Sequence, residues 1–230
     1  MHVLSRLPLY QRLSATDRRE LCGHMRVFLD EKAFEGAHQT VVTDDMKVLI
    51  AAHACLLLLH RDTDYYPRLR SIIIYPDAFV APRRTRHAGW VESEYQEVLA
   101  GESWGHGVVV LSWADVVASA ARGDGHNVTL HEFAHQLDEE DGVANGAPVF
   151  GTDTDPVSWA HVMRDAYEQL RHAATEGNAT LLDPYGAESP AEFFAVATET
   201  FFERGRELRE THSRLYDELR RYYRQDPGVE

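Results

Sequence analysis

Two histidines four residues apart, with a glutamate directly after the first, limit the structure of this chain more than any other feature. They lie in the stretch VTLHEFAHQLDEEDG, residues 128–142. Residues i and i+4 share one face of a helix, so the imidazoles of His131 and His135 can reach the same ion. Asn127 is a suitable N-cap in front of them. We therefore predict a helix over about residues 128–138, with both histidines on one face.

The HEFAH motif contains the groups of a catalytic zinc site. Imidazole is a good zinc ligand, and zinc lowers the pKa of a bound water molecule to about 7. Glu132, beside the first histidine, could take the proton of that water as it attacks a carbonyl. The alternative is a pair of helix histidines without metal, since a chain with 13 histidines sometimes contains this motif by chance. The strand predicted for GVVVLSW, residues 107–113, could lie at the edge of a cleft and pair with an extended substrate.

A catalytic zinc ion needs a third protein ligand. The longer motif HExxHxxGxxH is absent, because Asp138 stands at the position of its glycine. A better source is SPAEFFAVATETFFER, residues 189–204, where Glu192 and Glu199 lie on one face of a largely apolar helix. Buried carboxylates need a partner, which a metal ion provides. Glu192 could instead form a capping box with Ser189, and Glu199 would then be the ligand.

Other polar residues are candidates for the same site. Tyr185, seven residues before Glu192, could donate a hydrogen bond to the oxyanion of a tetrahedral intermediate, or could simply pack in a loop. Asp138 shares the face of the two histidines. It could orient one of them by a hydrogen bond, contact the ammonium group of a substrate, or only be hydrogen-bonded at the helix end. If Glu199 is not a ligand, it too could orient a histidine or contact the ammonium group of a substrate.

The remaining sequence predicts a mostly helical α+β domain with a small sheet. We expect residues 83–102 to be polar and irregular, and residues 79–80 to be a candidate extension of the sheet. No repeat or linker divides the 230 residues, which predicts a single domain, residues 1–230. The expected helices are residues 14–35, 43–60, 113–121, 158–174, 189–210 and 213–223, and the expected strands are residues 71–75 and 107–113.

Charge and composition argue against several classes of partner. Asp and Glu outnumber Lys and Arg by 37 to 23, which gives a net charge of -14. Such a chain repels phosphate backbones and anionic lipid, so we expect neither nucleic acid nor a membrane as a partner. The longest apolar run, residues 48–59, is too short to span a bilayer. Two cysteines and no export signal at the start favour a cytoplasmic location.

Five segments of the chain carry a resemblance to a known family. In chain order they are LPLYQRL, AAHACLLLLHRDTDYYPRLRSIIIYP, GESWGHGVVVLSW, GHNVTLHEFAHQLD and SPAEFFAVATETFF. They resemble the Mlc titration factor A family of bacterial zinc-dependent peptidases. The resemblance implies one zinc ion held by His131, His135 and Glu192, with Glu132 as general base and Tyr185 as the tyrosine that contacts the transition state. It also implies a zincin-like fold similar to the catalytic domain of anthrax lethal factor.

The resemblance also implies an activity and a partner. Family members hydrolyse peptides, with aminopeptidase action on small unblocked substrates, and the enterobacterial member binds the glucose repressor Mlc. We therefore expect a zinc metallopeptidase with a peptide or protein substrate and, as a further partner, a sugar-responsive transcriptional repressor. The alternative is a regulatory binding protein that sequesters a transcription factor and keeps zinc for structure. The intact Glu132 argues against it, since a structural metal site needs no base.

Overall fold

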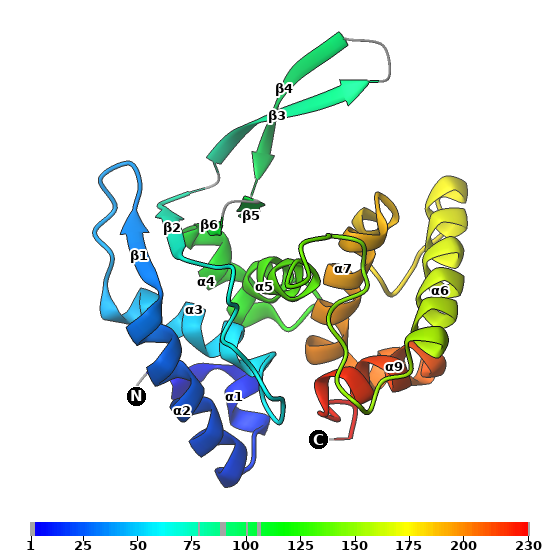
Figure 1. Cartoon of the computed structure of the whole chain (residues 1–230), viewed down its shortest axis with the longest axis horizontal. Helices are drawn as coiled ribbons and strands as arrows, with labels where there is room; N and C mark the ends of the chain where they lie inside the picture. Colours follow the sequence, from blue (N-terminus) through cyan, green and yellow to red (C-terminus); the bar gives the residue numbers. More distant parts are fainter. Residues whose placement is uncertain (1–2, 78, 88–90, 100, 105–106, 230) are drawn as a thin grey trace.

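The computed structural model describes residues 3–77, 79–87, 91–99, 101–104 and 107–229, with side chains for residues 3–77 and 107–229. Helices make up most of the described residues, and a small sheet lies to one side of them (Figure 1). The predicted class, mostly helical α+β with a small mixed sheet, is confirmed.

The helices fall into two groups along the chain. Those before the predicted metal-binding helix are η1 (Leu4–Arg6), α1 (Pro8–Arg12), α2 (Ala15–Glu31), α3 (Asp44–Leu56) and α4 (Trp113–Arg122). That helix and those after it are α5 (Val128–Asp138), α6 (Pro156–Glu176), η2 (Pro184–Ala187), α7 (Pro190–Glu203), α8 (Gly205–Thr211) and α9 (Ser213–Tyr223).

The main sheet has four strands in the order β1-β2-β6-β5. Its strands are β1 (Ala33–Gly36), β2 (Ser71–Tyr75), β5 (Gly101–Trp104) and β6 (Val108–Ser112). β2 is parallel to both β1 and β6, and β5 runs antiparallel to β6. The expectation that GVVVLSW pairs with an extended substrate is wrong, because β6 pairs with a neighbouring strand on each side. The edge strands are β1 and β5, and β5 lies against α5.

A separate hairpin replaces the irregular segment expected over residues 83–102. Its strands, β3 (Phe79–His87) and β4 (Val91–Leu99), pair antiparallel from Phe79 opposite Leu99 to His87 opposite Val91. In Figure 1 this hairpin extends away from the main sheet. Residues 79–80 therefore belong to the hairpin and do not extend the four-stranded sheet. The segment is too polar to show the apolar alternation by which a strand is recognised.

Three predicted helices end earlier than expected. The first stops at Glu31, because residues 33–36 pair with β2 as strand β1. The second stops at Leu56, and His60 has a left-handed φ of 63° that no helix continues through.

The third predicted helix, residues 189–210, is two helices that meet at Arg204. The break follows from close packing of the backbone at Gly205. A Cβ atom at this position would lie 2.9 Å from the backbone nitrogen of Gly228, so the C-terminal segment can approach only because the residue is glycine.

Helix α5 lies in the middle of the fold (Figure 1). The ring of Phe133 lies 5.6 Å from that of Phe28 and 5.0 Å from that of Tyr66, and all three side chains are buried. On its other side α5 packs against α7. One apolar cluster includes buried residues from α2 through α9, and a single domain over residues 1–230 stays a prediction.

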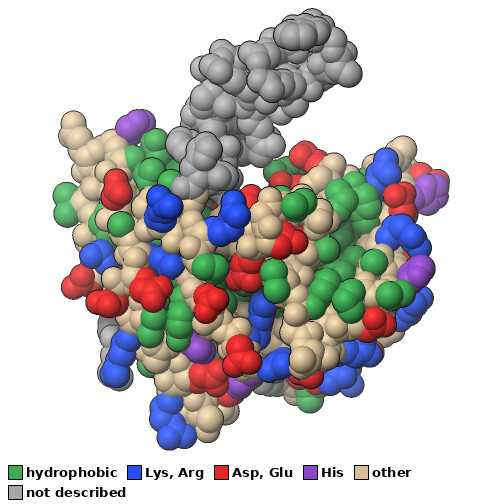
Figure 2. Space-filling view, in the orientation of Figure 1, with side chains coloured by type: hydrophobic (Ala, Val, Ile, Leu, Met, Phe, Trp, Pro, Cys, Tyr) green, Lys and Arg blue, Asp and Glu red, His purple; other side chains and the backbone are tan. Residues whose placement is uncertain are grey.

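The described part of the chain contains no helix that is both long and apolar enough to cross a membrane. On the face viewed in Figure 2, acidic and basic side chains are interspersed among apolar and neutral ones. The net charge of -14 is thus not gathered into one acidic patch on that face.

Candidate metal centre

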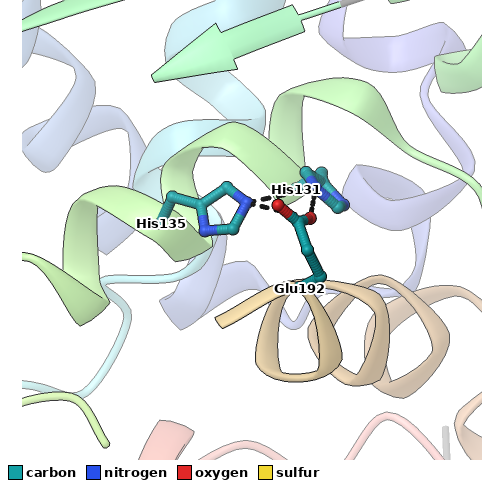
Figure 3. A group of neighbouring side chains, drawn as sticks. All are labelled: His131, His135 and Glu192. Atoms are coloured by element: carbon teal, nitrogen blue, oxygen red, sulfur yellow. Dashed lines mark hydrogen bonds and ion pairs between the residues drawn. The ribbon is translucent and has the colours of Figure 1, made fainter. Parts of the chain in front are cut away.

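The local sequence orients α5 as predicted. The side chain of Asn127 accepts a hydrogen bond from the backbone N–H of Leu130 and so caps the helix. The buried residues Leu130, Phe133, Ala134 and Leu137 face the core. His131 and His135 lie on another side of the helix and face α7 (Figure 3).

Three donor atoms converge between α5 and α7. The Nε2 atoms of His131 and His135 lie 3.2 Å apart, and Oε2 of Glu192 lies 3.0 Å from the first and 3.3 Å from the second. Ligands about 2.0–2.1 Å from a tetrahedral zinc ion are separated by about 3.3–3.4 Å. The triangle of donors is therefore close to one face of a zinc tetrahedron. Two imidazoles and one carboxylate also form a donor set that zinc favours.

Helix capping and the metal centre use different atoms of Glu192. Its backbone N–H donates to Oγ of Ser189, 3.1 Å away, and Pro190 occupies the first helical position of α7. The carboxylate points away from that cap toward the two histidines (Figure 3). The Ser189 cap is thus compatible with the metal interpretation, but the expected capping box is only half formed, because the contact from the Ser189 N–H to the Glu192 carboxylate is not among the described contacts.

Glu199 lies behind His131. Its Oε1 is 2.7 Å from Nδ1 of His131, and its Oε2 accepts a 2.5 Å hydrogen bond from the backbone N–H of Asn127. Its side chain is buried, with 5% of the residue exposed. Between the two carboxylates considered from the sequence, Glu192 is the one that faces both Nε2 atoms, while Glu199 contacts the other ring nitrogen of His131.

Glu132 is buried beside the triangle, with 4% of the residue exposed. Burial raises its pKa to about 7, although the neighbouring His131 and His135 act to lower it. Its Oε2 has no hydrogen-bond partner among the described residues. A carboxylate with a pKa near neutrality and an unpaired oxygen is suited to accepting and returning a proton.

The protein side chains alone favour a charged pair between His131 and Glu192. Burial opposes ionisation of both groups. For His131 the effect of burial is outweighed by the carboxylates of Glu199 and Glu192, so the pKa of His131 is raised well above the usual value. For Glu192 the hydrogen bonds and charge of the two histidines outweigh burial, and its pKa is well below the usual value. A cation between these groups would replace the proton that they share.

Tyr185 lies next to the same histidine. Its ring centroid is 6.0 Å from that of His131. It belongs to the short helix η2, which Asp183 caps by accepting a 2.7 Å hydrogen bond from the Tyr185 N–H. Tyr185 and Glu192, seven residues apart in the sequence, therefore both lie beside His131.

Asp138 is fully buried at the end of α5. Its Oδ2 accepts a 2.8 Å hydrogen bond from the N–H of Gly146, whose φ is 75°. A Cβ atom at Gly146 would lie 2.4 Å from the carbonyl oxygen of Pro190. Asp138 therefore attaches the loop after α5 close to the start of α7. A side chain with no exposed surface is poorly placed to meet a substrate ammonium, and an orienting function near His135 stays a prediction.

Sequence reasoning missed Glu203 and the side-chain amide of Asn127. The Asn127 Nδ2 donates to Oε1 of Glu203, and the N–H of Gly125 donates to Oε2, both at 3.0 Å. Burial raises the pKa of Glu203 to about 7, although these two donors act to lower it. A signal was present: Glu203 is four residues after Glu199 and eleven after Glu192, so all three carboxylates share one face of α7.

A second group of possible metal donors lies on α2 and after α3. It consists of Asp17, Glu20 and His60. The two ring nitrogens of His60 face separate carboxylates, Glu20 at 3.2 Å and Asp17 at 3.4 Å. Ion pairing of a histidine with two acids accounts for this arrangement, and we assign no metal to it.

Two histidines and a glutamate are a ligand set found in zinc peptidases. Residues 1–224 match the model of a family described as glucose-regulated metallo-peptidase M90, so the chain belongs to that family.

Two relatives extend the match over nearly the whole chain. The uncharacterized protein slr2042 of Synechocystis sp. is 45% identical over 226 residues, which cover 97% of this chain and 82% of the relative. Mlc titration factor A of Yersinia pestis is 28% identical over 231 residues, which cover 98% of this chain and 84% of the relative. The family predicted from the sequence motifs is confirmed.

A crystal structure of a candidate zinc-binding metallo-peptidase from Bacteroides caccae aligns over 94% of each chain, at 13% identity and a TM-score of 0.30. At that score the two chains do not superpose closely as a whole. The family assignment therefore rests on the sequence matches.

Proposed function

We propose that this chain is a zinc-dependent peptidase of aminopeptidase type, with one zinc ion and a single catalytic domain in the cytoplasm. The observation that carries the proposal is the triangle formed by Nε2 of His131, Nε2 of His135 and Oε2 of Glu192, with sides of 3.2, 3.0 and 3.3 Å. Membership of a metallo-peptidase family supports it.

His131, His135 and Glu192 would hold the ion. When bound, zinc acts as a Lewis acid that polarises the carbonyl of the scissile bond and makes a water molecule more acidic. Glu199 keeps the proton of His131 on Nδ1, because its Oε1 lies 2.7 Å from that nitrogen. The Nε2 lone pair of His131 is then free to face the ion.

Glu132 moves the protons of the reaction. Its unpaired Oε2 accepts a proton from the attacking water and later returns it to the nitrogen of the leaving amine. Burial favours the protonated form of this carboxyl, which helps it hold the proton between the two steps. Tyr185 supplies a phenol beside His131 that donates a hydrogen bond to the developing oxyanion.

The substrate would lie along β5. This strand is one of the two edges of the main sheet and the one that lies against α5, so an extended peptide could pair with its outer side close to the helix of the proposed zinc ligands. β5 thus takes the function that the sequence suggested for residues 107–113.

The direct test combines metal analysis with a substrate panel. Purified protein should contain one zinc ion per chain and cleave short peptides with a free N-terminus faster than the same peptides with an acetylated N-terminus. Equal rates on both would exclude the aminopeptidase assignment but keep the peptidase. Zinc-replete protein that cleaves neither would exclude the peptidase.

A regulatory binding function is the second candidate, because one relative carries the name Mlc titration factor A. The chain would then bind a sugar-responsive transcriptional repressor, either beside its peptidase activity or in place of it. The regulatory function is tested by measuring the binding of a purified sugar-responsive repressor from the same host. The measurement is made with wild-type protein and with Glu132→Gln. Binding that is equal in both would show that the two functions are separable.

A further inference from the structure

The first turn of α5 is fixed by two carboxylates of α7 rather than by its N-cap alone. Glu199 accepts the backbone N–H of Asn127, and Glu203 accepts both the Asn127 side-chain amide and the backbone N–H of Gly125. Both glutamates are buried, with 5% and 6% of each residue exposed. Every oxygen of the two carboxylates therefore has a donor in residues 125–131.

This arrangement links Glu203 to His131 through defined contacts. Asn127 uses its Oδ1 to cap α5 and its Nδ2 to contact Glu203, so its side chain is held from both ends. The N–H of Asn127 holds Oε2 of Glu199, whose other oxygen contacts Nδ1 of His131. Movement of Asn127 would thus displace the carboxylate that sets the ring orientation of His131.

We propose that Glu203 is a positioning residue for the metal centre: through Asn127 it holds the first turn of α5 and Glu199 so that Nε2 of His131 faces the ion. The inference rests on the proposed zinc function. Glu203 itself touches neither metal nor substrate. Groups that hydrogen-bond a metal ligand directly, as Glu199 does, change metal affinity about 10–100-fold when they are replaced, and Glu203 acts on that contact through Asn127.

Electrostatics favours the arrangement once Glu203 is ionised. The positive end of the α5 dipole faces both carboxylates, and the N–H groups of Gly125 and Asn127 point at their oxygens. Because burial raises the pKa of Glu203 to about 7, the test is made at pH 8.

Two variants remove the contact from opposite sides. Glu203→Gln keeps the size of the side chain but places an amide N–H₂ against one of the two N–H donors. Asn127→Ser keeps a helix-capping oxygen, since serine caps as well as asparagine, but loses the amide that reaches Glu203. Glu218→Gln is the matched control, because Glu218 is equally buried at 2% exposed but contacts Ser158 and Arg221 instead.

The readouts are zinc affinity by chelator competition and the visible absorption spectrum of the Co²⁺-substituted protein, together with melting temperature. Glu203→Gln and Asn127→Ser should each weaken zinc binding about tenfold or more and alter the Co²⁺ spectrum. The double variant should be no weaker than either single one, since both remove the same link. Glu218→Gln should keep wild-type affinity even if its melting temperature falls.

The inference is overturned if both Glu203→Gln and Asn127→Ser keep wild-type zinc affinity and an unchanged Co²⁺ spectrum. Their melting temperatures do not affect this outcome. If Glu203→Gln does not fold, Asn127→Ser alone decides in the same way. Failure of the wild-type protein to bind zinc would instead contradict the proposed function itself, so the two failures are distinguishable.

Discussion

Nδ1 of His131 lies 2.7 Å from Oε1 of Glu199, while Nε2 of the same ring faces His135 and Glu192. The imidazole is therefore held from both sides, by a carboxylate behind it and by the proposed ligand group in front. A histidine without this second contact could rotate, and either nitrogen could carry the proton. The contact determines which nitrogen is available to a metal ion.

Glu199→Gln should weaken zinc binding by about 10–100-fold while leaving the chain folded, because a neutral amide holds the imidazole less firmly than a carboxylate. Chelator competition measures the change. Glu207→Gln is the control, since Glu207 is half exposed and pairs only with Arg204 among the described contacts. Equal zinc affinity in the two variants would show that Glu199 does not support His131.

Tyr185→Phe should lower kcat by about 100-fold or more without changing zinc content, because it removes one hydrogen-bond donor to the oxyanion and keeps the ring beside His131. Tyr167→Phe is a matched control. The hydroxyl of Tyr167 donates to the carbonyl of Ala187 in the same short helix, so this change loosens the segment without removing the proposed catalytic phenol. Similar losses of kcat in both variants would show that Tyr185 contributes packing and not a hydrogen bond to the oxyanion.

Asp138→Ala should lower the free energy of unfolding by about 1–3 kcal/mol, since the buried N–H of Gly146 loses its acceptor. Urea denaturation measures this loss. Asp141→Ala, at an exposed position whose carboxylate accepts only from Val143 among the described hydrogen bonds, should cost much less. If both variants have the same stability, Asp138 does not anchor the loop.

His53 makes the stability of the fold depend on pH. Its Nδ1 donates to the carbonyl of Leu49 inside α3, and burial lowers its pKa from 6.5 to about 4. Between these values the unfolded chain holds a proton that the folded chain does not. Stability is therefore lost as the pH falls from about 6.5 to 4, by about 3 kcal/mol in total.

His53→Gln should flatten this part of the stability profile. Urea denaturation of both proteins at several pH values between 7.5 and 4 isolates the effect, because the histidines of the metal centre titrate in both and cancel in the difference. Parallel profiles would mean that His53 does not stay neutral in the folded chain.

Helix α5, which carries two of the proposed ligands, was predictable because its signals are local. Asn127 as N-cap, the apolar side of α5 and the histidine spacing are all visible within twelve residues, and the observed helix has the expected bounds. The two candidates for the third ligand, Glu192 and Glu199, were also predictable, because their spacing places them on one face of a helix. Which of the two faces the Nε2 atoms was not local information, since it depends on how α7 lies against α5.

Several errors came from partners distant in sequence. Residues 33–36 form a strand because β2, nearly forty residues later, offers a parallel neighbour. Helix α7 stops just before Gly205, where the C-terminal segment around Gly228 approaches the backbone closely. The contact between Asn127 and Glu203 joins residues 76 positions apart. Periodicity within one segment contains none of these relationships.

The most direct test of the central claim compares wild-type protein with Glu132→Gln, both loaded with zinc, on a peptide that has a free N-terminus. Both proteins should hold one zinc ion per chain, because Glu132 is not among the proposed ligands. Hydrolysis by the variant should be slower by about 10²–10⁴-fold, since it lacks the group that accepts the proton of water. Equal rates in the two zinc-loaded proteins would contradict the account.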